Sequence, residues 1–251
     1  MKEFVQGELG AFLLGHTAPD VQVISGQKRS ATHFFSVPIP DDALVPWDKI
    51  FLDYPSLEPV ADMEAGKAVF IAGYLCHLMA DWIWVSEIFE PKFGPKQEWA
   101  SFSERLYWHN ILRAYLDVET FSDLPVDIIL EIEFVDARDW LPFISDQDLE
   151  NWWSFLRKQL EPGKHVKTVE IFAARQGMDV LEFQKMLDSE DKMEENIFHH
   201  ISRSNLDNYA NNLVEKNIKL ISSYLGPRIA PQSTKDIRRA ATSDKVDRSS
   251  L

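Results

Sequence analysis

The sequence predicts an all-α protein: a compact bundle of many helices around a central buried helix, with long loops near its N-terminus. Residues 68–85 are apolar on most faces of a helix, which is typical of a helix at the centre of a bundle. Residues 98–121 repeat their apolar side chains at the spacing of a helix that packs on a core. Residues 20–62 hold five prolines and few periodic runs, which indicates long loops with short helical pieces.

Two helices are expected in the rest of the N-terminal half. Residues 3–15 form a short helix before the first proline. Asp62 belongs to the residue types that cap helix N-termini, so we expect it to begin a helix over residues 63–89. Pro91 and Gly94 are expected to stop that helix, because proline lacks a backbone N–H and glycine favours helix ends.

The C-terminal half is also expected to be helical. Residues 126–135 fit either a strand or a helix, whereas residues 146–160 start with acidic and end with basic side chains, as the helix dipole favours. Residues 168–188 look helical on both sides of Gly177. The last long helical pattern covers residues 190–225, and the glycine and proline at 226–227 should close it.

The whole bundle is expected to be one domain over residues 1–226. Residues 227–251 are polar and lack aromatic side chains, so we expect a disordered tail.

Charge and cysteine content narrow the possible functions. The chain of 251 residues carries 26 basic and 40 acidic side chains, a net charge of −14. Proteins that bind nucleic acids in general use lysine and arginine on phosphates, so this class is not expected. One cysteine, Cys76, allows no intrachain disulfide, and residues 1–15 lack the basic start and apolar run of a signal peptide. We therefore expect a cytoplasmic protein.

The apolar run at 68–85 approaches the length of a membrane span, but two polar side chains lie in its middle. His77 and Asp81 would cost several kcal/mol in lipid. A helix buried in a bundle is therefore preferred, and no transmembrane segment is expected.

These two side chains are also the first candidates for chemistry. His77 and Asp81 are four residues apart, so on a helix their Cβ atoms lie about 5–6 Å from each other, close enough to share a metal ion. A carboxylate among leucine, methionine and tryptophan is costly unless it is paired or bound to a metal. A hydrogen bond between the two side chains would satisfy both without any metal, and this alternative stays open.

Asp20 and His33 strengthen the metal interpretation. Asp20 follows a proline in the segment GHTAPD, and His33 precedes two phenylalanines in the segment THFF. Two histidines and two aspartates in apolar surroundings match the nitrogen and oxygen ligands of Zn²⁺, and they also suit manganese or iron.

The ordered set LGHTAPD, THFF and AGYLCHLMAD resembles the zinc-dependent phospholipase C family, which is related to the S1/P1-type nucleases. The resemblance is strongest over residues 9–94, weaker over 98–120, and ends near residue 125. It implies a compact helical protein that hydrolyses phosphate esters with bound zinc. It also implies that one zinc ion is held by four residues: Asp20, His33, His77 and Asp81.

Full members of this family hold two further metal ions, and the sequence departs from both of those sites. One of them uses the free amino terminus of the mature chain, whereas Met1 here shows no cleavable leader. The other uses a His-x-x-x-Glu pair, whereas His109 is followed four residues later by Arg113. Glu87 and Glu104 are nearby carboxylates that could take the place of that glutamate.

Several further residues have a functional and a structural interpretation. His109 is either an extra ligand or proton donor, or a histidine of the core. His16 either supports a ligand or binds a second metal. Arg29 and Arg113 either face an anionic substrate or serve as surface charges. His199 and its neighbour His200 are expected at the surface.

The resulting hypothesis is a metal-dependent hydrolase of phosphate esters that uses zinc-activated water. Asp20 would hold the metal and accept the proton of the water, and His109 would act as general acid. The substrate would be a small-molecule phosphate ester or a phospholipid. The alternatives are a helical protein with a structural metal and no catalysis, and a metal-free interaction protein in which the histidines and aspartates satisfy each other.

Overall fold

The computed structural model describes residues 1–97, 99, 101–121, 124–125, 128–133, 135–160 and 168–229. Every regular element in these residues is a helix, so the expected all-α class is confirmed. The described part begins with α1 (Lys2–Gly7), α2 (Leu9–Thr17), α3 (Gln22–Ser25), α4 (Arg29–His33) and α5 (Pro46–Asp53). This part also holds three short 3₁₀ helices: η1 (Ala18–Val21) between α2 and α3, and η2 (Pro55–Leu57) and η3 (Val60–Asp62) between α5 and the central helix.

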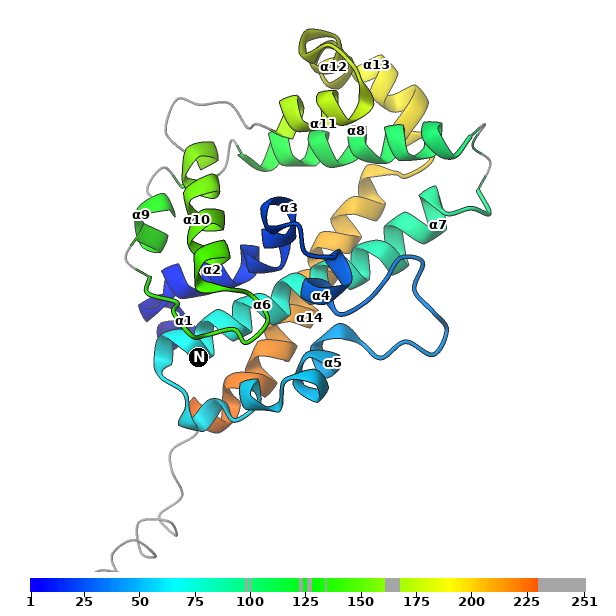
Figure 1. The fold of residues 1–251 in the computed structure, drawn as a ribbon. Coiled ribbons are helices and arrows are strands. Elements are labelled where there is room, and N and C mark those ends of the chain that lie inside the picture. Colours follow the sequence, from blue (N-terminus) through cyan, green and yellow to red (C-terminus); the bar gives the residue numbers. More distant parts are fainter. Residues whose placement is uncertain are drawn as a thin grey trace, which may run out of the picture.

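The expected central helix is confirmed. The α-helix α6 (Ala65–Ile83) continues through the π-helix η4 (Trp84–Phe89) into α7 (Glu90–Phe93), and it crosses the middle of the molecule in Figure 1. This continuous helix is long and apolar enough to cross a membrane by length and composition. However, 72% of its most apolar window is buried inside the protein, as in the core helix of a bundle.

The start of the central helix differs from expectation, and of the two expected stop signals Gly94 ends the helix whereas Pro91 does not. Asp62 ends η3 instead of capping α6, because Met63 is extended and the helix starts after Glu64. Pro91 lies inside the helix and does not stop it. The preceding π-helical turn, in which the Glu90 N–H bonds to the Val85 carbonyl five residues back, accommodates a residue that has no N–H.

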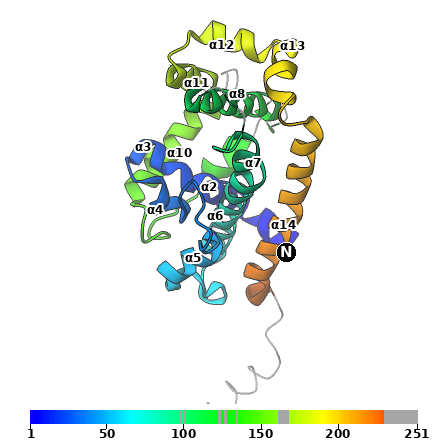
Figure 2. The ribbon, with the colours of Figure 1, turned by 90° about the vertical axis from the view of Figure 1, so that its right-hand side faces the viewer.

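Two helices enclose α6, and α2 approaches it most closely. Figure 2 shows α2 on one side of α6 and α14 (Arg203–Ile229) on the other. The contact between α2 and α6 depends on glycines at the crossing point. A Cβ atom on Gly15 would lie 2.0 Å from the Phe70 carbonyl oxygen, and one on Gly73 would lie 2.2 Å from the Phe12 carbonyl oxygen. Only residues without a side chain let the two backbones touch here.

The remaining helices form a second layer and the flank beside α2. They are α8 (Phe102–Phe121), α9 (Ile128–Glu133), α10 (Asp146–Leu160), α11 (Thr168–Gln176), α12 (Val180–Leu187), α13 (Glu190–Met193) and the π-helix η5 (Glu194–Phe198). The ambiguous segment 126–135 is therefore helical over Ile128–Glu133. Gly177, with φ of +64°, separates α11 from α12 as expected.

The last helical pattern is not one helix. It breaks at residues 199–202, where the Ser202 hydroxyl accepts the Asn205 N–H at 3.2 Å and starts α14. The glycine and proline at 226–227 do not end α14 either. The Arg228 guanidinium donates to the carbonyls of Val60 and Met63, which fixes the last turn. The helix therefore ends at Ile229 and not at residue 225 as expected, and residues 230–251 of the expected tail lie outside the described residues.

Candidate metal centre

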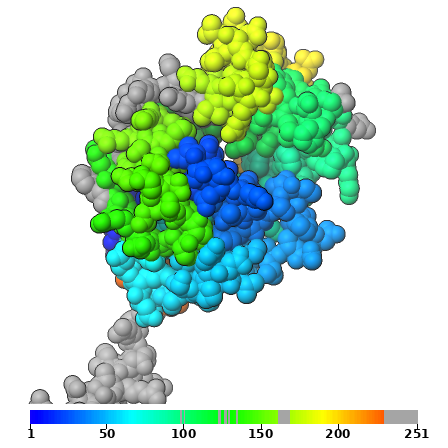
Figure 3. All heavy atoms as spheres, in the orientation of Figure 1, coloured from blue at the N-terminus to red at the C-terminus, as the bar shows by residue number. Residues whose placement is uncertain are grey.

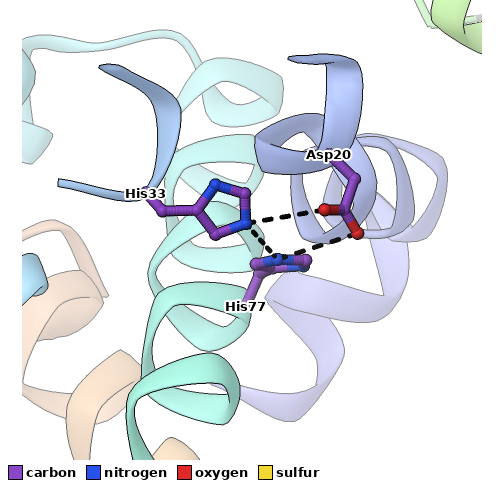
Figure 4. Close-up of side chains that lie close together, drawn as sticks. All are labelled: Asp20, His33 and His77. Carbon is purple, nitrogen blue, oxygen red and sulfur yellow. Dashed lines mark hydrogen bonds and ion pairs between the residues drawn. The ribbon is translucent and has the colours of Figure 1, made fainter. Parts of the chain in front are cut away.

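Three separate elements bring the predicted ligands together. Asp20 lies on the 3₁₀ helix η1, His33 ends α4, and His77 is in the middle of α6. One ligand atom from each residue lies within 4.8 Å of the others, and Figure 4 shows the three side chains pointing toward one another. These residues, named the triad below, could hold a metal ion. Asp20 and His33 are 13 residues apart in the chain, and His33 and His77 are 44 residues apart, so their expected convergence is confirmed.

The orientation of His77 is set by the contact between α2 and α6. Its Nδ1 donates to the backbone carbonyl of His16 at 2.7 Å. Because Nδ1 carries the hydrogen, the lone pair of a neutral ring is on Nε2, which faces the other two triad residues. The glycine at 73, one turn earlier on α6, lets α2 come near enough to make this bond.

His33 is oriented in the same way. Its Nδ1 lies 3.3 Å from the Arg29 carbonyl oxygen and 3.0 Å from the Thr32 hydroxyl, so the lone pair is again on Nε2. Phe34 ends α4 with φ of +63°, and the Tyr74 hydroxyl donates to the Thr32 carbonyl at 2.5 Å. The side chain of His33 is fully buried, so these bonds hold it in a single position.

The four polar atoms at the centre of the triad need a cation. The Nε2 atoms of His33 and His77 are 3.3 Å apart. Asp20 Oδ1 lies 3.5 Å from His33 Nε2, and Asp20 Oδ2 lies 4.0 Å from His77 Nε2. Two lone pairs and a carboxylate facing one another repel each other unless a proton or a metal ion lies between them.

The pKa shifts of Asp20 and His33 indicate which side chain carries the proton when no metal ion is bound. Burial raises the pKa of Asp20, but its hydrogen bond with His33 and the charge of His77 outweigh burial and lower it overall. Burial lowers the pKa of His33, but Asp20 and Asp81 outweigh burial and raise it overall. A proton on His33 therefore competes with a metal ion for the same position. In the metal-free alternative, a protonated His33 pairs with the carboxylates of Asp20 and Asp81.

Asp81, the fourth expected ligand, also faces the two histidines of the triad. Its Oδ2 is 3.2 Å from His33 Nε2 and 3.9 Å from His77 Nε2. The same oxygen accepts a hydrogen bond from Arg29 Nη2. Arg29 was expected either to face an anionic substrate or to serve as a surface charge, and its pairing with Asp81 could not be inferred from spacing.

His16 supports the site through its backbone. Its ring lies edge-on to that of His77, with centroids 5.7 Å apart. Burial lowers the pKa of the His16 ring to about 4, and its Nδ1 has no partner among the described residues. The structure thus gives the expected supporting role to the carbonyl, which accepts from His77, and not to the imidazole.

His109 lies in a different cluster. Its ring is 8% exposed and packs against Phe89 and Phe93, and its Nε2 accepts the Trp84 Nε1–H at 2.9 Å. Burial, and to a lesser degree the charge of Arg113, lowers its pKa to about 3. The described contacts do not connect it with the triad, and a ring that is neutral near pH 7 with its Nε2 engaged is a poor proton donor.

This environment predicts that His109 makes the protein sensitive to acid. The unfolded chain takes up a proton below about pH 6.5 that the native His109 refuses down to about pH 3, so stability falls as the pH decreases through this range. His109→Phe should cost about 1–3 kcal/mol at pH 7, because the Trp84 N–H loses its acceptor. Urea unfolding should show that the variant loses about 2 kcal/mol less free energy of unfolding, relative to wild type, at pH 5 than at pH 7. An equal deficit at both pH values would contradict the assignment.

The expected ligands of further metals are not assembled. Glu87 is bound to Lys216 at 3.1 Å and to Asn212 at 3.2 Å on α14. In the ranges that the structure describes, the candidate metal centre is the triad, and Asp81 Oδ2 lies 3.2 Å and 3.9 Å from the Nε2 atoms of its two histidines.

Comparison of the chain with family models, with curated proteins and with solved structures found no match. The functional argument therefore depends on the geometry of the triad.

Proposed function

We propose that this protein is a zinc-dependent hydrolase of phosphate esters with an activity similar to that of phospholipase C. The observation that carries the proposal is the convergence of two imidazole lone pairs and one carboxylate. Each imidazole has its Nδ1 placed against oxygen acceptors, so Nε2 is the atom free to bind a cation. The resemblance in residues 9–94 supports the substrate class.

The donor set supports zinc as the metal. Two neutral nitrogens and one carboxylate oxygen are ligands that zinc accepts in nearly tetrahedral geometry, and three protein ligands are typical of catalytic zinc sites. Bound zinc lowers the pKa of a water molecule towards 7 and offsets charge on a phosphoryl oxygen. The residues of the chain supply the rest of the chemistry.

Asp20 is the triad member best placed to meet substrate and water. Its side chain is 43% exposed, whereas those of His33 and His77 are 0% and 13% exposed. In Figure 3 the segment that carries Asp20 and α4 lies at the surface of the face shown. Since its pKa is lowered, Asp20 is ionised at neutral pH, and its carboxylate can hold the metal and accept a proton from the attacking water.

Aromatic side chains beside the site suit an organic substituent on the phosphate. Phe35 lies two residues after His33 and packs edge-on against Trp82 with ring centroids 5.4 Å apart, and Trp47 also packs edge-on against Trp82. This supports a phosphodiester with an apolar group, such as a phospholipid. The net charge of −14 and the single cysteine support a cytoplasmic protein that does not bind nucleic acids in general.

Turnover of a chromogenic phosphodiester tests the proposal. The zinc-loaded protein should hydrolyse bis(p-nitrophenyl) phosphate, and a chelator should abolish the activity. Asp20→Asn should reduce kcat/KM by at least about 100-fold, because it removes a metal ligand. Asp42→Asn, at an exposed aspartate, is the matched control and should be active. Bound zinc without any turnover would identify the non-catalytic alternative instead.

A further inference from the structure

Arg29 and Asp81 form an ion pair at the edge of the triad. Arg29 Nη2 donates to Asp81 Oδ2, the oxygen that also lies nearest to His33 and His77. The two side chains are 35% and 32% exposed, so the pair is partly buried next to the triad. The guanidinium of Arg29 and a metal ion on the triad would therefore compete for this one carboxylate oxygen.

The pair affects how many ligands the chain offers. An oxygen that accepts a charge-assisted hydrogen bond from a guanidinium is a weaker donor to a metal ion. With Asp81 held in this way, the triad supplies three ligands and leaves a fourth position open. If Asp81 also bound, four protein ligands would close the site, as in structural zinc sites.

Arg29 is also held in place to receive an anion. Its guanidinium carbon lies 4.8 Å from the centroid of the Phe35 ring, a stacking arrangement that fixes the plane of the group. A guanidinium has five N–H donors, and its described hydrogen bond to Asp81 uses a single nitrogen, Nη2.

We propose that Arg29 keeps Asp81 out of the metal's coordination and binds the phosphate group of the ligand that enters the position left open. This inference rests on the proposed function, because it requires a metal ion on the triad. It adds a specificity-determining residue: the chain selects tetrahedral phosphate through a guanidinium beside the metal, whose planar fork matches two phosphate oxygens.

The test compares wild type, Arg29→Gln and Lys28→Gln. Lys28 is exposed and adjacent in sequence, so its variant removes the same charge without touching Asp81. Zinc affinity is measured by competition with a chromophoric chelator, and inorganic phosphate is titrated into the zinc-loaded proteins by calorimetry. Arg29→Gln should bind zinc about tenfold more tightly, because Asp81 is released, and phosphate at least about tenfold more weakly. Lys28→Gln should stay within about twofold of wild type for both.

Each of the other outcomes would contradict one claim of the proposal about Arg29. Unchanged phosphate affinity in Arg29→Gln would exclude Arg29 as the phosphate-binding residue. Unchanged or weaker zinc binding would exclude the competition for Asp81, and equal effects in Lys28→Gln would show that charge alone acts. In these three cases wild type still binds zinc, so the proposed function survives. Absence of zinc from wild type itself would overturn both.

Discussion

His77→Ala is expected to leave the protein without bound zinc. His77 supplies one of the three triad ligands, and His33 is the only other described histidine in that group. Zinc affinity should fall by more than about 100-fold, since loss of a direct ligand exceeds the 10- to 100-fold effect of an outer hydrogen-bond partner. Metal content after gel filtration, measured by mass spectrometry, and competition with a chelator give the result.

His199→Ala is the matched control. This histidine is exposed and lies outside the triad, so its variant should retain the full zinc content. If His77→Ala kept one zinc per chain, the triad would not be the metal site. If neither wild type nor variant bound zinc and both differed only in stability, the histidines and aspartates would satisfy each other as in the metal-free alternative.

Gly73→Ala should both destabilise the fold and weaken zinc binding. The new methyl group would lie 2.2 Å from the Phe12 carbonyl oxygen and 2.9 Å from the His16 nitrogen. These are backbone atoms of α2, so the helices must separate, at a cost of about 3 kcal/mol or more. Separation also lengthens the bond from His77 to the His16 carbonyl, which orients the metal-binding ring. Urea unfolding and zinc competition measure the two effects.

Gly7→Ala provides the control for a glycine in a helix. A Cβ atom at Gly7 meets nothing within 4 Å, and the residue belongs to α1. Alanine should therefore leave stability unchanged or raise it by up to about 1 kcal/mol, and zinc affinity should not change. A Gly73→Ala protein with wild-type stability and wild-type zinc affinity would show that α2 and α6 do not meet as closely as the structure has them.

The central helix and half of the site could be predicted from local sequence. An apolar run at 68–85 with two polar side chains in its middle favours a helix buried in a bundle, and the four-residue spacing of His77 and Asp81 puts both on one face of it. Asp20 and His33 could be added because their residue types and order suit zinc and resemble a known pattern. The three triad residues do meet, as that pattern implies.

Helix ends were less predictable, because distant contacts decided them. The glycine and proline at 226–227 are good stop signals, yet α14 passes them, since the Arg228 guanidinium reaches carbonyls of a loop more than 160 residues earlier. Asp62 is a good cap, yet it ends a 3₁₀ helix that α14 packs against. Local preferences of about 1 kcal/mol are overridden by such contacts.

The sequence by itself determined which side chains can bind a metal and that a buried helix carries two of them. Only the tertiary structure decided how they work together: which nitrogen of each histidine faces inward, and that Arg29 takes the oxygen of Asp81. The physical reason is that these features depend on backbone carbonyls and charges brought together by the crossing of α2, α4 and α6. Hydrogen bonds across 61 and 52 residues of chain depend on distances that a linear pattern does not contain.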